Sequence, residues 1–190
     1  AQLSAFKYVE TGAVTVSTAG AVTLQDNFRT TTATFNLNAA GNQIDLTGQG
    51  NAAYTVNGGA AVDTITGGNL ADALTGNGGN DLLTGGAGAD DFRFTSVTSG
   101  QDRIFDFSGT TDFDGGVGDG DDFVFVGLLA GTFSYVGAAA FVNNGNSQAR
   151  FSAANTLQVD TNGNGVADIT ITVDGLTSAT QLVASDFSWV

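Results

Sequence analysis

The chain has 190 residues, which is enough for one large domain or two small ones around a hydrophobic core. It contains no cysteine and no histidine, which excludes disulfides, zinc thiolate sites, HExxH zinc proteases and catalysis by a cysteine or a Ser-His-Asp triad. With 5 Lys and Arg against 19 Asp and Glu, the net charge of −14 disfavours nucleic acid and anionic membrane surfaces as partners, and no segment is long enough for membrane insertion.

Residues 1–57 consist of short segments in which apolar and polar residues alternate, as they do in half-buried β-strands. Turns rich in glycine, asparagine and alanine separate these segments, which are AVTVST, AVTLQD, TATFNLN, QIDLTG and AAYTVNG. A large apolar residue recurs every nine or ten positions, at Leu37, Leu46, Val56 and Ile65. We therefore expect N-terminal β-strands that form a degenerate upstream extension of the repeat that follows.

Residues 58–93 contain four consecutive nine-residue repeats, GGAAVDTIT, GGNLADALT, GNGGNDLLT and GGAGADDFR. The sixth place of each repeat is an aspartate, namely Asp63, Asp72, Asp81 and Asp90. The eighth place is a large apolar residue, namely Ile65, Leu74, Leu83 and Phe92. This is the G-G-x-G-x-D-x-U-x pattern of calcium-binding β-helices, in which U is large and apolar.

A glycine-rich turn of six residues followed by three extended residues makes half a coil, so two repeats complete one coil. Residues two repeats apart then stack at the inter-strand spacing of about 4.8 Å. This geometry predicts an all-β fold, a parallel β-roll, in which Asp63 stacks on Asp81 along one edge and Asp72 on Asp90 along the other. Asp45 lies two nine-residue steps before Asp63 and is the one further pairing that the sequence allows.

Carboxylates stacked at this spacing repel each other by about 3 kcal/mol per pair at an effective dielectric constant near 20. A Ca²⁺ ion between the coils reverses that sign, because it binds carboxylate and carbonyl oxygens. We therefore predict several Ca²⁺ ions, held by the four repeat aspartates and by turn carbonyls such as those of Gly59, Gly68, Gly86 and Gly88. Ala61, Leu70 and Asn77 depart from the glycine pattern, which puts individual carbonyl ligands in doubt. The alternative is a series of glycine-rich turns with solvated aspartates.

From residue 94 the repeat stops and period-two strands follow in RIFDF, DFVFVGL, TFSYVG, ARFSA, TLQVD and ADITITV. TSATQLVAS near the end is expected to form a single short helical turn. No linker separates the parts, so residues 94–190 are expected to pack as a β cap, like a sandwich, on the end of the roll.

This C-terminal part contains three further groups of candidate calcium ligands. Asp102 and Asp106 bracket the segment RIF and are expected to join the cation chemistry of the last coil. The loop DFDGGVGDGDD is either solvated or holds a cation through Asp114, Asp119 and Asp121. The segment DTNGNGVAD matches an EF-hand loop at Asp160, Asn162, Asn164 and Asp168, but Ile171 replaces its last glutamate, and a turn between strands explains the segment equally well.

Little in the sequence indicates catalysis, so we expect no enzyme. Paired aspartates could serve a glycosidase, but each of them has a better explanation as a turn or calcium residue. There is also no GxSxG motif and no phosphate-binding glycine loop before a helix.

The repeats and the segment DDFRFTSVTSGQDRIFDFSG that follows them resemble the RTX proteins, and most closely the C-terminal domain of serralysin-like metalloproteases. The resembling motif consists of Asp91, Phe92, Phe94, Asp102, Ile104, Asp106 and Phe107. The tail also resembles the closing strands of that family, with Asp186 followed by Phe187, Trp189 and Val190. The resemblance covers about residues 58–190.

The resemblance implies a calcium-loaded β-roll and an uncleaved C-terminal signal read by a type I (ABC transporter) secretion system. The start AQLSAFKYVETG has no basic region followed by an apolar run, as a signal peptide would. We therefore expect a secreted, extracellular, non-catalytic module that is unfolded at low calcium and folds outside the cell. The alternative is a structural subunit or fragment of a calcium-dependent surface layer or adhesin that self-assembles on the cell surface.

Overall fold

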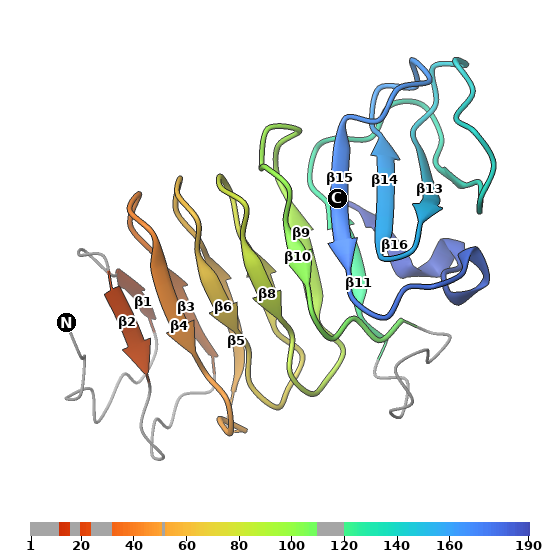
Figure 1. Cartoon of the computed structure of the whole chain (residues 1–190). Helices are drawn as coiled ribbons and strands as arrows, with labels where there is room; N and C mark the ends of the chain where they lie inside the picture. The colour runs from red at the N-terminus through yellow and green to blue at the C-terminus, as the bar shows by residue number, and fades with distance from the viewer. Residues whose placement is uncertain (1–11, 16–19, 24–31, 51, 110–119) are drawn as a thin grey trace.

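The computed structural model describes residues 12–15, 20–23, 32–50, 52–109 and 120–190. Within them the chain is all-β, as the sequence predicts. Its strands form two sheets, and in each sheet the strands follow one another along the long axis of the molecule (Figure 1). The strands are β1 Gly12–Thr15, β2 Gly20–Thr23, β3 Thr32–Asn36, β4 Asn42–Asp45, β5 Ala53–Asn57, β6 Thr64–Thr66, β7 Ala73–Thr75, β8 Leu82–Thr84, β9 Asp91–Phe94, β10 Arg103–Ile104, β11 Asp122–Phe125, β12 Ser134–Tyr135, β13 Gln148–Ala153, β14 Thr156–Asp160, β15 Ile169–Val173 and β16 Phe187–Trp189.

The N-terminal part is a parallel β-roll. Odd-numbered strands build one sheet in the order β1-β3-β5-β7-β9, and even-numbered strands build the other in the order β2-β4-β6-β8-β10. Each strand pairs in parallel with the strand one full coil away, so that Ile65 aligns with Leu83 and Leu74 with Phe92. The stacking that the nine-residue repeat predicts is therefore confirmed for these core residues.

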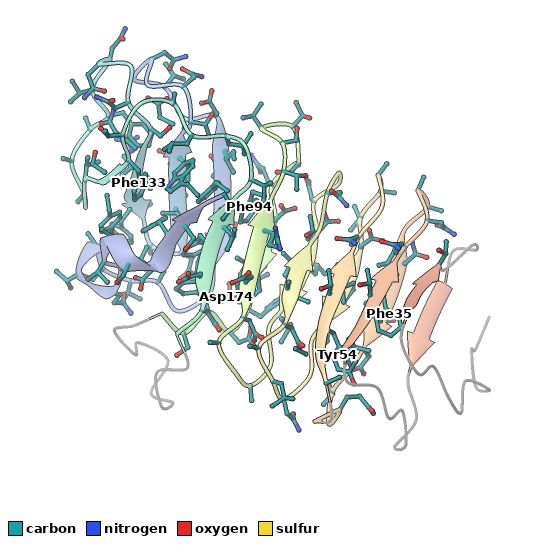
Figure 2. All side chains as sticks on the ribbon, turned by 180° about the vertical axis from the view of Figure 1, so that it is seen from behind. Phe35, Tyr54, Phe94, Phe133 and Asp174 are labelled. Atoms are coloured by element: carbon teal, nitrogen blue, oxygen red, sulfur yellow. The ribbon has the colours of Figure 1, made fainter. Side chains whose placement is uncertain are left out.

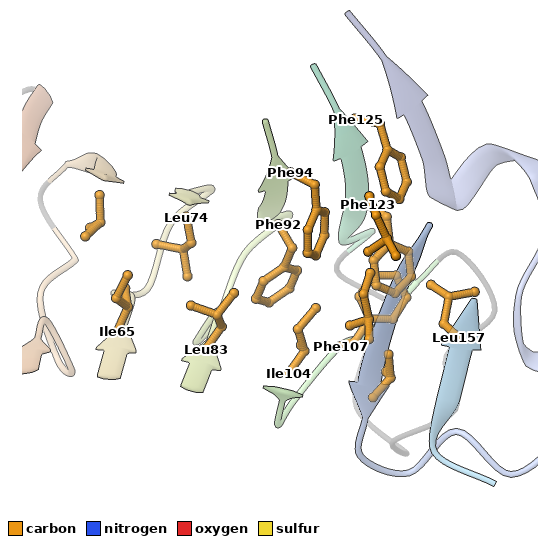
Figure 3. Packing of buried hydrophobic residues seen from close by; sticks show 14 of the residues in the cluster. Ile65, Leu74, Leu83, Phe92, Phe94, Ile104, Phe107, Phe123, Phe125 and Leu157 are labelled. Carbon is orange, nitrogen blue, oxygen red and sulfur yellow. The ribbon is translucent and has the colours of Figure 1, made fainter. Parts of the chain in front are cut away.

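A single thin core runs between the two sheets (Figure 3). Within each short strand the residue in the middle points inward and its neighbours point outward, because successive side chains of a strand alternate between its faces. Ile65 and Leu74 thus face each other from opposite sheets and are fully buried. Each coil contributes only two such large side chains to the array, so every one of them carries much of its coil's burial.

The coils before the regular repeats belong to the same roll but contain more residues per coil. Phe35 and Ile44 occupy the core positions there, paired with the corresponding residues of the next coil. The series expected from the sequence assigned these positions to Leu37 and Leu46, and that alignment is wrong, although both side chains are buried. The reason is coil length, because equivalent positions are 21 residues apart here and 18 apart in the regular repeats.

The C-terminal cap continues both sheets without a break. Strands β11 and β16 extend the first sheet, whereas β15, β14 and β13 continue the second and pair with one another in antiparallel fashion. Stacked aromatic rings fill the junction, with 4.1 Å between the ring centroids of Phe107 and Phe123 and 5.5 Å between those of Phe123 and Phe187. Phe94 lies at this end of the roll and Phe133 in the cap, whereas Phe35 lies at the opposite end (Figure 2).

The helical content of the described residues is confined to two 3-10 turns, η1 Ala179–Gln181 and η2 Ala184–Asp186. The first lies within the segment predicted to form one helical turn, and the second overlaps the end of that segment. Ser178 caps η1 by accepting a hydrogen bond from the amide of Thr180. Neither turn has the length or the apolar character needed to cross a membrane.

A first prediction concerns the thin core. Leu74→Ala should lower the free energy of unfolding by about 2–5 kcal/mol, because it opens a cavity that the two neighbouring coils cannot close. Leu70→Ala is the matched control, since Leu70 lies in a turn and is 42% exposed, and it should change stability little. Chemical denaturation measures both, and equal effects of the two substitutions would contradict the stacked core.

Candidate metal centre

The first column of acidic side chains runs along one edge of the roll and contains Asp63, Asp81 and Asp102. The backbone amide of each column position donates to the Oδ1 atom of the aspartate one coil further on. These distances are 2.7 Å from Asn42 to Asp63, 2.7 Å from Asp63 to Asp81 and 2.9 Å from Asp81 to Asp102. Each carboxylate therefore joins two coils.

The second column is built in the same way along the other edge. The amide of Tyr54 donates to Asp72 at 2.6 Å, that of Asp72 to Asp90 at 2.7 Å and that of Asp90 to Asp121 at 2.8 Å. Asp63 thus stacks on Asp81 and Asp72 on Asp90, as predicted. In each pair the backbone amide of the first aspartate donates to the carboxylate of the second.

The columns are buried because of where the aspartates stand in the repeat. Each lies two places before an inward-facing apolar residue, and residues two apart on an extended chain share a face. The four repeat aspartates, together with Asp102 and Asp121, are each no more than 2% exposed. Buried carboxylates need partners, because an ionised group away from water is otherwise very costly.

The Oδ2 atoms of the repeat aspartates divide into two classes. In the first two repeats the second glycine of the same turn donates to this atom, at 2.6 Å from Gly59 to Asp63 and 2.6 Å from Gly68 to Asp72. In the third and fourth repeats Oδ2 of Asp81 and Oδ2 of Asp90 are buried and have no hydrogen-bond partner. The repeats thus differ in how they satisfy the carboxylate, and the first two are also the ones that lack glycine at the fourth place, where they have Ala61 and Leu70.

Backbone conformation produces this difference. In the third repeat Asn77 and Gly79 have φ angles of 65° and 132°, and in the fourth Gly86 and Gly88 have φ angles of 100° and 118°. The equivalent residues of the first two repeats do not have positive φ angles. In the fourth repeat the amide of Gly86 is instead directed to Asp106, at 2.9 Å from its Oδ2 atom.

The surroundings of the Asp81 and Asp90 carboxylates disfavour their ionised forms. Burial, together with the charges of Asp102 and Asp63, raises the pKa of Asp81 to about 7. Burial likewise raises the pKa of Asp90 to about 8, with contributions from neighbouring aspartates, Asp121 first among them. At neutral pH these groups require either a proton or a cation.

The structure adds residues to the columns that pairing by nines did not assign. Asp102 and Asp121 continue the two columns, and their spacings from the preceding aspartates are 21 and 31 residues. The signal was present in the sequence, since each stands two places before an apolar residue that aligns with the core, in DRI and DDF. Asp106 also joins the array, by accepting hydrogen bonds from the amides of Gly85 and Gly86.

The expected pairing of Asp45 with Asp63 is wrong. In the register of β4 and β6, Asp45 aligns with Thr66, and its side chain accepts a hydrogen bond from the amide of Thr47 at 2.9 Å. Asn42 takes the place below Asp63, because the coil is longer there than two repeats. Asp114 and Asp119 of the acidic loop lie outside the described residues.

The EF-hand-like segment forms a closed turn between β14 and β15. Oδ1 of Asp160 accepts the amides of Asn162 and Gly163, and its Oδ2 accepts that of Gly165. Asp168 accepts hydrogen bonds from the amide and hydroxyl of Thr161 and from the Asn162 side chain, while Oδ1 of Asn164 accepts an amide within the turn. These bonds hold the turn together without a cation, which favours the turn interpretation of this segment.

The turn carbonyls differ along the roll as the carboxylates do. The carbonyl of Gly59 accepts the amide of Gly78 at 3.0 Å, and that of Gly68 accepts the amide of Ala87 at 3.1 Å. Among the described residues no backbone amide donates to the carbonyls of Gly86 or Gly88.

The residues fit a hard divalent cation that takes most of its ligands from the backbone. Within the described part of the chain no three acidic side chains converge on one point, so an ion would be bound by one or two carboxylates and by carbonyl oxygens. The unpartnered Oδ2 atoms of Asp81 and Asp90 are the strongest indication of such an ion, because buried oxygens of this kind are rare without a partner.

No protein-family model matches the chain, and no curated protein matches it. The candidate site therefore rests on the repeat pattern and on the geometry of the two columns.

A second prediction is that the calcium-free roll loses stability as the pH rises from about 4 to about 8. The pKa values of Asp81 and Asp90 in the folded chain lie at about 7 and about 8, above the ordinary value of 3.8, so the folded chain keeps protons that the unfolded chain has released. This contribution to the stability of the folded chain is complete below pH 3.8, the ordinary pKa, and is lost as the pH rises through the pKa values of Asp81 and Asp90 in the folded chain.

Thermal unfolding in calcium-free buffer across this pH range tests the prediction. The double variant Asp81→Asn, Asp90→Asn removes both groups and should flatten the profile. A melting temperature of the unaltered chain that rises with pH over this window would contradict the assignment.

Proposed function

We propose that this chain is a non-catalytic, calcium-dependent folding and secretion module of an exported bacterial RTX protein. The observation that carries the proposal is the pair of buried carboxylate oxygens without a hydrogen-bond partner, Oδ2 of Asp81 and Oδ2 of Asp90, in two neighbouring repeats of the roll. A Ca²⁺ ion at each position would supply the missing partner and remove the repulsion within the column.

The proposed mechanism links export to folding. At the low calcium of a cytosol, the stacked carboxylates and the thin core would leave the chain unfolded enough to pass through a type I ABC transporter. Outside the cell, calcium binding adds to the free energy of folding, because only the folded roll brings the ligands together. The ordered ladder of coils would then form in the secreted protein.

A second candidate function is a structural subunit or fragment of a calcium-dependent surface layer or adhesin. Its support is the architecture, since both sheets are open and end, within the described residues, at β1 and β2 on one side and at β12 and β16 on the other. Unpaired strand edges can pair with another copy of the chain. This role would use the same calcium sites and add self-assembly.

A third prediction tests the calcium dependence common to both roles. Addition of millimolar CaCl₂ to the chain in EGTA should increase its β-sheet circular dichroism and raise its melting temperature, and excess EGTA should reverse both changes. A site filled at 100 times its dissociation constant contributes about 2.7 kcal/mol. MgCl₂ is the control, because Mg²⁺ prefers a smaller octahedral site with several waters.

A chain that is equally folded and equally stable in EGTA and in calcium would refute the proposed function. Electron microscopy of the calcium-loaded chain then separates the two roles. Dispersed monomers favour the secretion module, and ordered sheets or filaments favour the surface layer.

A further inference from the structure

The turn that precedes the regular repeats has no aspartate in its column, and the side chain of Asn42 occupies that position. Its Nδ2 atom donates to the carbonyl of Ala40, to the carbonyl of Asn38 at 3.2 Å and to Oδ1 of Asp63 at 3.3 Å. The orientation of the amide is fixed, because all these neighbours are acceptors. Two turn carbonyls and one column carboxylate are the kinds of ligand that a calcium ion would collect, and here a neutral NH₂ group holds them.

The other column begins with a different neutral group. Tyr54 stands at the position one coil before Asp72, and its ring lies next to Gly68, where an added Cβ would come within 3.2 Å of the ring. The side chain is 1% exposed and its ring centroid lies 6.1 Å from that of Phe35 (Figure 2). An aromatic ring thus fills the position at which later coils place a carboxylate.

The first two repeats complete their own hydrogen bonding. Both carboxylate oxygens of Asp63 and both of Asp72 accept backbone amides, and the carbonyls of Gly59 and Gly68 accept amides from the next coil. No oxygen of these two aspartates lacks a donor. The buried oxygens without a partner in the coil before them, Oδ1 of Asn42 and the Tyr54 hydroxyl, belong to neutral side chains.

The next turns in each column have unpartnered oxygens on two successive coils. In the first column these are Oδ2 of Asp81 and, in the following turn, the Ser99 hydroxyl. In the second column they are Oδ2 of Asp90 and, in the following turn, the Ser108 hydroxyl. All four side chains are at least 97% buried, so water does not replace the missing partners in the way it would at the surface.

We propose that the cation sites of the roll begin only at the third repeat, and that neutral groups and backbone amides take the place of a cation in the coils before it. The boundary lies between the turn of Asp72 and the turn of Asp81. This inference rests on the proposed function and limits the calcium-dependent segment to the half of the array that adjoins the cap.

The same substitution has opposite consequences on the two sides of this boundary. In Asp63→Asn, one of the two backbone amides that face the carboxylate, from Asn42 or from Gly59, loses its acceptor to the new NH₂ group. In Asp81→Asn, the carbonyl oxygen can still accept the amide of Asp63, and the NH₂ group replaces the unpartnered oxygen, as in the turn of Asn42.

The matched variants Asp63→Asn and Asp81→Asn test the boundary by calorimetric titration with CaCl₂ and by melting in EGTA and in calcium. Asp63→Asn should lower the melting temperature in both buffers and bind as many ions as the unaltered chain. Asp81→Asn should melt no lower than the unaltered chain in EGTA and should bind at least one ion fewer. Equal loss of ions in the two variants, or none in Asp81→Asn, would overturn the inference.

A third variant keeps the test decisive if Asp63→Asn does not fold. Asn42→Asp places a second carboxylate against Asp63 and removes the NH₂ donor, so it should melt at a lower temperature in EGTA and gain at least one bound calcium ion. An Asn42→Asp chain with unchanged stability in EGTA would contradict the role of the Asn42 amide. Failure of the unaltered chain to bind any calcium would instead refute the proposed function itself, which is a separate outcome.

Discussion

The structure depends on one interaction, the hydrogen bond from a backbone amide of one coil to a buried carboxylate of the next. It recurs along both edges of the roll, for example from Asp63 to Asp81 and from Asp72 to Asp90. Aspartate suits this position because its short side chain reaches the neighbouring coil without leaving its own turn. The first glycine of each repeat follows from the same constraint, since a Cβ at Gly58 would approach Oδ2 of Asp63 to 2.8 Å.

This interaction is present along both columns, but it leaves the whole carboxylate satisfied in only part of the stack. Two amides satisfy Asp63 and Asp72, whereas Asp81 and Asp90 keep one oxygen without a donor and have raised pKa values. One structural rule therefore gives coils whose carboxylates are satisfied by backbone amides and coils in which, under the proposed function, a cation would complete the carboxylate. If calcium binds as proposed, a fold made of both kinds would keep its register fixed while its stability responds to calcium, as the proposed folding module would require.

The regular array could be predicted from the sequence, because in residues 58–93 one period sets the turn, the carboxylate and the core residue together. The alignment of Asp45 could not be predicted, because the coil before the array is longer than two repeats and shifts the register. Asp102 and Asp121 keep the two-residue offset from the core, so that offset is a better guide than the count of nine. The two classes of Oδ2 atom coincide with the fourth place of the repeat, which is Ala61 or Leu70 in the first two repeats and a glycine with positive φ, Gly79 or Gly88, in the last two. Pairing by nines did not use this difference.

A crystal structure of the chain grown with calcium, with the ions located by anomalous diffraction, would show directly whether Asp81 and Asp90 hold ions that Asp63 and Asp72 do not. We expect ions at about 2.3–2.6 Å from Oδ2 of Asp81 and Oδ2 of Asp90, with turn carbonyls completing each site, and no ion at Asp63 or Asp72. Equal occupancy along the whole array would contradict the boundary, and a calcium-saturated crystal with no ion at Asp81 or Asp90 would contradict the proposed calcium sites.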